Sequence, residues 1–399
     1  MKCLRWILLL SLITPPAWSA SNKKISVEEL RDMLTTLQHE KKNDEETATQ
    51  LKQTELTEQL TAATMNSMAP LISGPLSTEQ MYVLEARSSI LPPPASDLPS
   101  AAAPDAAAQQ AMLAKAQDYV SKSYTQLPRL TASRMTARFQ DGIVTPPTYS
   151  SIQGGITDNK DPVFEQAKVW VRLMNTKTDT IESENGIEKI EKNDKSVKDK
   201  TQWGPNGLAA SIGPTLALNT AMQEITSNGN PKWLRWESID GKQVAAYSFA
   251  VEKKKTHFSV IYCCFPQTDT TGTTHVASPI SAGSNIPGNM QNNVQWSSFK
   301  AGSGYHGELF LDPDTGTVVR LITEADFKPS DFVHREAIRT DFTPMTIGGK
   351  TLVVPIRSFN VAEVVPNGDA NAARFTIRHQ FVTQDYKDYQ LAGATTAQK

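Results

Sequence analysis

The sequence predicts an α+β fold, in which an N-terminal helical domain precedes a large curled antiparallel β-sheet packed on a helix. Apolar residues recur every three or four positions between residues 20 and 127, which is typical of amphipathic helices. After Leu127-Pro128 the period changes to two, which is typical of strands with one buried face. Gly-containing turns separate many of these alternating runs. These runs amount to about eight or more antiparallel strands, and a sheet of so many strands must twist and curl, so we expect a half-barrel.

Composition bounds the class of protein. The chain has 399 residues, which is enough for two domains and a substantial core. Its 40 basic and 42 acidic side chains give a formal net charge of −2, so the chain has no overall positive charge to neutralise nucleic-acid phosphates. We therefore do not expect a nucleic-acid partner.

Residues 1–19 have the features of a secretory signal peptide. Two basic residues precede an apolar run at 6–13, and small residues at Ala17 and Ser19 suit cleavage after Ser19. The apolar run is too short to anchor the chain across a bilayer, and no later segment is a transmembrane candidate. We expect a mature chain that is exported to the periplasm or the extracellular space and is soluble after signal-peptide removal.

Residues 20–127 are predicted to form the helical domain. Ser26 and Glu29 form a capping-box pattern at the start of the first helix, and the polar run 39–46 is predicted to turn the chain. A second helix is expected because Leu56, Leu60 and Ala63 have the spacing of one helix face.

Two further helices are predicted, at 77–90 and 106–126, with a Pro/Ala-rich segment at 91–105 between them. This segment is predicted to be a linker or a surface strap. The apolar stripes of the helices favour packing against the neighbouring domain. A partner-binding coiled coil is the less favoured alternative, because no heptad pattern persists.

Residues 128–391 are predicted to form the β domain, followed by a small polar tail at 392–399. The first strands are expected at 133–139 and 167–173. In the first of them apolar residues face one way and Arg, Thr and Gln face the other, which predicts one buried and one wet face. Residues 175–202 are mostly polar and charged and are predicted to be a solvated loop.

One inserted helix is expected near 206–225, and three hairpin turns follow it. They are predicted at Asp240-Gly241, at 312–316 and at Gly348-Gly349, where residues that favour turns separate alternating runs.

A last strand is predicted at 374–381, and a long exposed loop at 266–293. In this strand, the apolar side of the alternation is predicted to face the core and the polar side to face solvent. The core-facing residues would be Phe375, Ile377, His379 and Phe381, and the solvent-facing residues Arg374, Thr376, Arg378 and Gln380.

No complete catalytic or metal-binding motif is present. Residues 348–351 lack the first glycine of a phosphate loop, and 312–316 lack most ligands of a calcium loop, so no cofactor and no metal are expected. Ser297 and Lys300 have the spacing of a Ser/Lys pair but fall in a predicted strand, which separates their side chains. His306 is the one histidine to test as a catalyst, although the sequence ties no cysteine or carboxylate to it.

Cys263 and Cys264 are adjacent in a predicted strand. Neighbours on a strand point to opposite faces, so a disulfide between them would be strained. Two small, partly buried thiols are the favoured interpretation, and a vicinal redox pair is the alternative.

Aromatic residues in the sheet region are the candidate ligand-binding residues. Aromatics on strands are first of all core or interface material, and lining a lipid or peptide site is the more specific alternative. The candidates are Trp170, Trp233, Trp236, Phe249 and Phe258.

Several short segments of the β domain carry a resemblance to known exported bacterial domains. They are Leu127-Pro128, 135–139, 236–241, Ala246-Tyr247, 305–313, Thr315-Gly316, Arg320, 347–349 and 352–355. Over roughly residues 128–385 the layout resembles the outer-membrane lipoprotein carrier and the periplasmic sensor of lipoprotein-like or lipid signals. A likeness to uncharacterised exported proteins of soil bacteria also covers the helical half. The resemblance implies a curled sheet around helices, with an apolar interior.

Together these features predict an exported, non-enzymatic binding protein. It would hold an apolar ligand, such as a lipid, an acyl chain or a hydrophobic peptide, between the curled sheet and helices. The alternative is a structural or assembly component of the cell envelope that acts by protein–protein contacts. A hydrolase of unknown substrate is the third hypothesis. The expected partner is thus an apolar ligand or an envelope protein.

Overall fold

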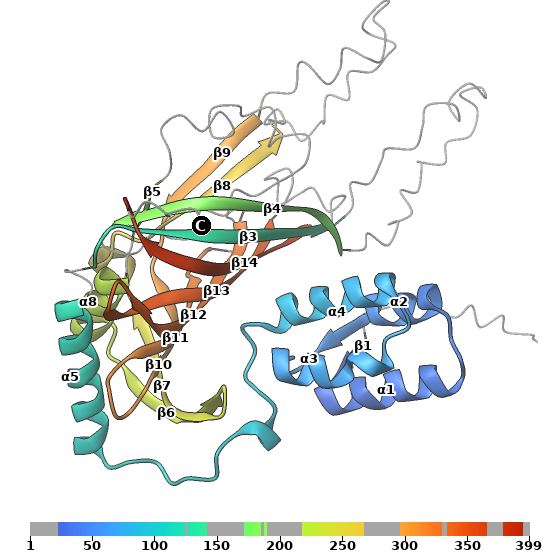
Figure 1. Cartoon of the computed structure of the whole chain (residues 1–399), viewed down its shortest axis with the longest axis horizontal. Coiled ribbons are helices and arrows are strands. Elements are labelled where there is room, and N and C mark those ends of the chain that lie inside the picture. Colours follow the sequence, from blue (N-terminus) through green and yellow to red (C-terminus); the bar gives the residue numbers. More distant parts are fainter. Residues whose placement is uncertain are drawn as a thin grey trace, which may run out of the picture.

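The computed structural model describes residues 23–123, 127–141, 171–184, 187–189, 218–266, 296–328, 333–364 and 378–393. These residues form a helical unit, a large antiparallel sheet and two helices on one face of that sheet (Figure 1). The predicted α+β class is confirmed, and the sheet is not closed into a barrel. The predicted signal peptide and Trp170 lie outside the described residues.

The helical unit comprises residues 23–88, and a long connection leads from it to one further helix. The elements are β1 Lys23–Ile25, α1 Val27–His39, α2 Asp44–Lys52, β2 Thr54–Leu56, α3 Ala62–Met68, η1 Ala69–Leu71, α4 Pro75–Ser88, η2 Ala95–Asp97 and α5 Ala106–Ser123. The capping box at the start of α1 is confirmed. Ser26 Oγ accepts from the Glu29 amide at 3.1 Å, and Glu29 Oε2 accepts from the Ser26 amide at 2.8 Å.

The second predicted helix is wrong. Within the polar run 39–46, α2 already begins at Asp44. Leu56 ends β2, which pairs in parallel with β1, while Ala63 lies in α3. Apolar residues three to four positions apart are expected on one helix face, but they can also come from a short strand and the helix that follows it when both pack against the same core. The pairing partner of β2 is distant in sequence, so local periodicity could not reveal it.

The helical unit has its own hydrophobic core. Leu30, Leu34, Leu51, Leu60 and Met68 are each no more than 1% exposed and pack together. These side chains form a core separate from that of the sheet.

Ten strands of the described chain form one sheet, in the order β5-β4-β3-β14-β13-β12-β11-β10-β7-β6. All neighbours are antiparallel. The strands are β3 Leu130–Asp141, β4 Val171–Glu184, β5 Ile187–Lys189, β6 Lys232–Ile239, β7 Lys242–Val251, β10 Tyr305–Leu311, β11 Val318–Ala325, β12 Val333–Ile347, β13 Lys350–Val364 and β14 Arg378–Leu391. A separate hairpin consists of β8 Ser259–Pro266 and β9 Trp296–Gly302, and its first strand contains Cys263 and Cys264.

The three predicted hairpin turns are confirmed. Asp240 and Gly241 join β6 to β7 with φ of 50° and 76°. Gly316 has φ of 75° between β10 and β11, and Gly348 and Gly349 have positive φ between β12 and β13. These backbone angles explain why glycine and aspartate occupy the turns.

The predicted loop 175–202 needs correction. Here β4 continues to Glu184, and β5 covers Ile187–Lys189. A strand can pair along its whole length through the backbone without apolar alternation, so its polar composition concealed it. The inserted helix is α8, Leu218–Asn228, which ends before Gly229, and residues 206–217 lie outside the described ranges. No helix within the described ranges has the length and apolarity to cross a membrane.

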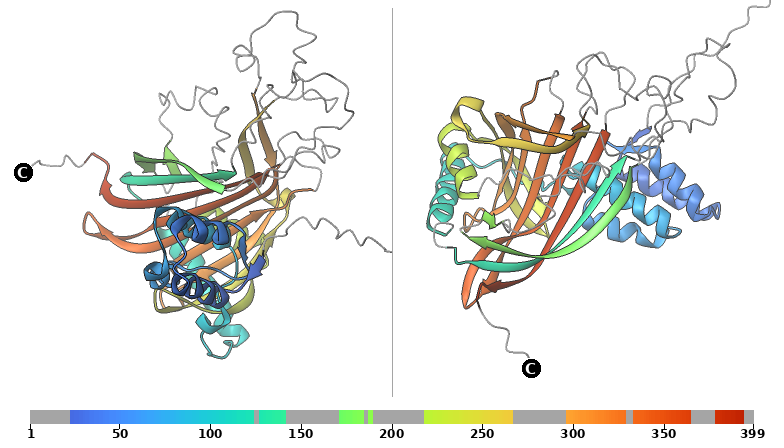
Figure 2. Two further views of the ribbon diagram at one scale, coloured as in Figure 1. Left: turned by 90° about the vertical axis from the view of Figure 1, so that its right-hand side faces the viewer. Right: turned by 90° about the horizontal axis from the view of Figure 1, so that it is seen from above.

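α5 and α8 cover one face of the sheet, which we call the inner face (Figure 2). This face carries Tyr247, Tyr305 and Leu309, each no more than 1% exposed. Ala116 of α5 and Met222 of α8 are equally buried in the same core. The space between these helices and the sheet is therefore filled by protein side chains.

α4 docks on the opposite, outer face, so the helical unit and α5 lie on opposite sides of the sheet (Figure 2). Val83 and Ala86 of α4 pack with Phe359 and Phe381 of the sheet. The Glu79 carboxylate also accepts a hydrogen bond at 2.8 Å from the backbone of β4. Apolar contact and hydrogen bonding together fix the helical unit to this face.

A row of charged side chains crosses the outer face beside α4. Arg320 donates to Asp341 at 2.6 Å and to Glu237 at 3.2 Å. Arg339 donates to Asp341 at 2.6 Å and to the backbone oxygen of Ser89, just beyond α4, at 3.1 Å. Burial by itself raises the pKa of Asp341, but the charges of Arg339 and Arg320 outweigh it and lower the pKa to about 2.

The inner face is polar where it crosses β13 and β14. Ser358, Asn360 and Gln380 are buried there, and Asn360 donates to Glu336 at 2.5 Å. The prediction that Gln380 faces solvent is therefore wrong, because its side chain is buried on the inner face. Phe381 is buried as predicted, on the outer face beneath α4. The reason is that both faces of this strand are screened from solvent. The apolar part of the inner face is concentrated beneath α5 and α8.

Candidate binding site at the aromatic edge of the sheet

The structure brings four of the five aromatic candidates to the inner face. Trp233 and Trp236 lie on β6, Phe249 lies on β7, and Phe258 directly precedes β8. All four belong to one hydrophobic core or pack against it. Trp170 lies outside the described residues, so the structure does not show whether it joins them.

Phe249 and Phe258 are parts of the filled core. Their exposures are 5% and 3%, and both rings contact Tyr305, with centroid distances of 5.8 Å and 4.9 Å. Their side chains thus contribute to packing in this state of the molecule.

A buried carboxylate fastens α8 to this core. Tyr305 donates its hydroxyl to Glu224 of α8 at 3.0 Å, and Thr256 donates to the same oxygen at 2.6 Å. Burial, and then the charge of Glu224, raise the pKa of the Tyr305 hydroxyl far above its usual value. This arrangement satisfies the buried carboxylate and holds the helix in place.

The other two aromatic candidates lie at the open edge of the sheet. Trp233 contacts Trp236 edge to face, with ring centroids 4.8 Å apart, and contacts Tyr247 in the same way at 5.6 Å. Both indole rings are half-buried, whereas Tyr247 is 1% exposed. We call these three residues the tryptophan patch. Because β6 is the last strand of the sheet among the described residues, the patch adjoins an edge to which no other described strand pairs.

The segment 91–105, which we call the strap, passes this edge. It leaves α4 on the outer face and reaches α5 on the inner face by way of β6 (Figure 1). The Trp236 indole N–H donates to the Ala102 carbonyl at 2.8 Å, and the Tyr247 hydroxyl donates to the Gln109 carbonyl at 3.0 Å. The strap thus lies beside an edge that would otherwise be open to pairing with another chain. Burial raises the pKa of Tyr247 to about 12, so its hydroxyl remains a donor.

α5 is held in place at the β10–β11 turn. A Cβ added to Gly316 would lie 2.7 Å from the carbonyl carbon of Lys115, so the turn and the helix backbone are in close contact. Lys115 also donates to the carbonyls of Pro313 and Asp314, at 3.2 Å and 3.0 Å. The strap is therefore tethered at its α5 end as well as at α4.

In the described part of the chain, His306 contacts a carboxylate but no nucleophilic side chain. Its Nδ1 is 2.7 Å from Asp326 Oδ1, and both side chains are about half exposed. The nearby Ser303 hydroxyl donates to the Asp326 backbone oxygen at 2.8 Å and is buried. A histidine and a carboxylate alone supply a base but no reacting group. Within the described ranges, no group of His, Cys, Asp and Glu is arranged to hold a metal ion.

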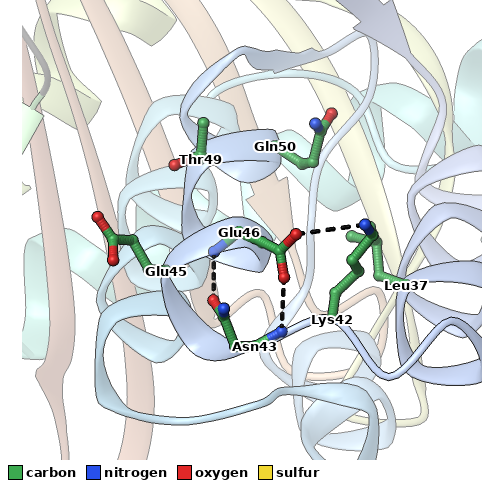
Figure 3. A pocket seen from close by; sticks show the side chains of 7 residues that line it. All are labelled: Leu37, Lys42, Asn43, Glu45, Glu46, Thr49 and Gln50. Atoms are coloured by element: carbon green, nitrogen blue, oxygen red, sulfur yellow. Dashed lines mark hydrogen bonds and ion pairs between the residues drawn. The ribbon is translucent and has the colours of Figure 1, made fainter.

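A shallow pocket of about 330 Å³ lies on the helical unit, between α1 and α2 (Figure 3). Its polar groups bond to one another. Glu46 accepts from the Asn43 amide at 3.1 Å and from Lys42 at 3.2 Å, and these contacts, the Asn43 amide first, lower the pKa of Glu46. The arrangement is that of a helix cap. The lining residues are Leu37, Lys42, Asn43, Glu45, Glu46, Thr49 and Gln50.

Sequence reasoning missed two members of the edge site. From the sequence, Tyr247 appears only in the Ala246-Tyr247 segment of the resemblance, and the Ala102 carbonyl belongs to a segment predicted as a linker or strap. The available signal was the combination of a Pro/Ala-rich segment and a strand with two tryptophans. The two are joined in space only because the strap passes β6.

No family model matches this chain, and no curated protein or solved structure matches it. The function is therefore inferred from the fold and from the geometry of the tryptophan patch.

Proposed function

We propose that this chain is an exported, non-enzymatic binding protein that holds an apolar group, such as an acyl chain or a hydrophobic peptide, against the aromatic part of the inner face. The observation that carries the proposal is the contrast between two sets of aromatics. Phe249 and Phe258 are enclosed in the core, whereas Trp233 and Trp236 are half-buried beside a strap. Large aromatic rings at such a position offer apolar area without a need to unfold the core.

The strap supports this proposal because it is held lightly at the patch. Ala101, Ala102 and Ala103 are exposed, and one hydrogen bond from Trp236 joins them to the sheet. A hydrogen bond of this kind contributes only about 1 kcal/mol to stability, so the strap can yield to a ligand at modest cost.

The test combines native mass spectrometry with binding of a fluorescent naphthalene sulfonate dye. We expect the mature protein to co-purify with an apolar compound or to bind the dye, and Trp236→Ala to weaken dye binding about five-fold or more. The matched control is Tyr82→Ala, which removes a 44% exposed aromatic from α4 and is expected to leave dye binding unchanged. A protein that carries no bound compound and binds no dye contradicts the proposal.

A second candidate function, an assembly component that acts by protein contacts, is favoured by the helical unit. This unit has its own core, is fixed to the outer face, and exposes Leu76 and Tyr82 of α4. A photo-crosslinking residue at Tyr82 is expected to capture an envelope protein in cells, and the same residue at the exposed Lys122 is not. Equal capture at both positions, or none, argues against this function.

A further inference from the structure

The main-chain contact between the strap and the tryptophan patch identifies a class of ligand. The Trp236 indole N–H bonds to a backbone carbonyl, and the side chains on either side of that carbonyl are exposed methyl groups. The patch therefore contacts the backbone of the strap and does not require a particular side chain at that position. A site of this kind tolerates many sequences, provided that the peptide is extended and presents its carbonyls.

Parts of the strap have an extended backbone of the kind that such a site requires. Leu98 has φ of −82° and ψ of 130°, and Pro94 has φ of −53° and ψ of 142°. Between them lies the short 3-10 turn η2, in which Pro94 accepts a hydrogen bond from the Asp97 amide at 2.9 Å. The angles of Leu98 and Pro94 are close to those of the polyproline II helix. Pro99 and Pro104 restrict the backbone on both sides of Ala102. A residue in this conformation makes no internal backbone hydrogen bond, and beyond η2 the Ala102 carbonyl accepts from the Trp236 indole.

The chemistry of the patch matches that of known sites for proline-rich peptides. Those sites are aromatic surfaces on which an extended peptide lies at little cost in conformational entropy. Here two indole rings and the Tyr247 ring pack edge to face, and one indole points its N–H at the peptide backbone. The two features together, aromatic area and a carbonyl donor, are present on one edge strand and its neighbour.

We infer that the tryptophan patch is a binding site for an extended Pro/Ala-rich peptide of a partner protein, and that the chain's own strap occupies this site in its resting state. This inference rests on the proposed function and specifies its ligand. The strap is tethered at both ends, so it competes with a partner peptide for the tryptophan patch at an effective concentration on the order of millimolar. Partner peptides therefore bind weakly until the strap is displaced or loosened.

The experiment uses a fluorescein-labelled synthetic peptide with the sequence of residues 97–105, DLPSAAAPD. Binding is followed by fluorescence anisotropy with the full mature chain and with a loosened variant, Pro99→Gly/Pro104→Gly. Glycine increases the freedom of the unbound strap and so weakens its occupancy. The peptide is expected to bind the loosened variant about ten-fold more tightly than the wild-type chain.

The donor is tested in the loosened variant, because in the wild-type chain a change at Trp236 weakens strap and peptide alike. Trp236→Phe retains an aromatic ring but removes the N–H, and should weaken peptide binding about five-fold. Trp233→Phe removes the same ring area on the same strand, where the described structure gives the indole no hydrogen bond, so it should weaken peptide binding less than Trp236→Phe does. A peptide with glycine in place of both prolines should bind about ten-fold more weakly.

The outcomes separate the inference from the proposed function. If the labelled peptide does not bind the loosened variant at millimolar concentration, or if Trp236→Phe and Trp233→Phe have equal effects, the inference is wrong. The proposed function survives such a result if the chain still binds the dye or carries an apolar compound, and it falls with the inference if it does neither. A loosened variant that dimerises through exchanged straps supports the site only if free peptide dissociates the dimer, and otherwise overturns the inference.

Discussion

Arg357 on β13 donates two hydrogen bonds to Glu85 on α4, from Nη1 to Oε1 at 2.8 Å and from Nη2 to Oε2 at 3.2 Å. The Glu85 side chain is 4% exposed and lies between the apolar contacts of α4 and the charged row of the outer face. This pair joins residues far apart in the sequence, and it fixes the helical unit in one orientation on the sheet. A two-point contact between a guanidinium and a carboxylate is directional as well as strong.

Glu85→Gln should destabilise this junction. The amide retains the shape of the side chain but leaves a partly buried arginine with the Asp385 carboxylate, 3.1 Å away, as its remaining acidic contact. We expect the free energy of unfolding in urea to fall by about 2–3 kcal/mol, together with faster proteolysis of the strap. Asp118→Asn, which breaks the exposed pair with Lys122, is the control and should cost about 0.5 kcal/mol or less. Equal losses in the two variants would show that the Glu85 pair contributes no more than a surface pair.

Gly307→Ala should disrupt the pairing of β10 with β11. A Cβ at this position would lie 1.9 Å from the backbone oxygen of Ile322, which is impossible without movement of the strand. We expect a loss of about 3 kcal/mol or more in thermal or urea unfolding. Gly302→Ala is the control, because its nearest contact would be 3.7 Å away, and it should change stability by less than about 1 kcal/mol. A stable Gly307→Ala variant would mean that the two strands are not in this register.

The hairpins could be predicted from sequence because their causes are local. Asp240-Gly241 and Gly348-Gly349 need positive φ, and few residue types adopt it without strain. The failures had distant causes. Leu56 joins a strand because its partner is β1, and Gln380 is buried although it lies opposite an apolar face. Periodicity identifies which residues share a face, but it does not show whether a second layer covers the other face.

Half of the candidate site was predictable. Trp233 and Trp236 were candidates because aromatics on strands line sites or cores, and the structure brings them together at the sheet edge. Their separation from Phe249 could not be predicted, since burial depends on where α5 and α8 lie. The role of Ala102 was hidden for another reason. A backbone carbonyl has no sequence signature, and only the path of the strap places it beside Trp236.

Asp341→Asn tests the charged row of the outer face. The folded protein lowers the pKa of Asp341 from 3.8 to about 2, so this carboxylate contributes stability above its unfolded pKa and loses that contribution as the pH falls toward 2. We expect the variant to be less stable by about 2 kcal/mol at pH 7, and the difference from wild type to shrink progressively below pH 4.

The measurement is the free energy of unfolding in urea as a function of pH. Asp240→Asn is the matched control, since it makes the same chemical change in an exposed turn where asparagine is also tolerated. Its effect should be below about 0.5 kcal/mol at pH 7. A pH-independent loss in Asp341→Asn would show that packing, and not charge, accounts for the effect.

Tyr305→Phe tests the contact between α8 and the sheet. The folded state raises the pKa of Tyr305 well above the usual 10, and that of Tyr247 to about 12. A raised pKa contributes stability that is complete below pH 10 and is lost as the pH rises through the folded value. In a spectrophotometric titration, both hydroxyls should therefore remain protonated when exposed tyrosines ionise, and should ionise late or only with unfolding.

Removing the Tyr305 hydroxyl should make this late step smaller by one tyrosinate. It should also lower the free energy of unfolding at pH 7 by about 1–2 kcal/mol, because Glu224 then loses a buried donor and retains Thr256. The stability difference from wild type should diminish above pH 10, where the wild-type contribution is lost. Tyr82→Phe, at a 44% exposed ring, should change the free energy of unfolding by less than about 0.5 kcal/mol. If Tyr305→Phe leaves the late step unchanged, the hydroxyl is not enclosed with Glu224, and α8 does not cover the sheet as described.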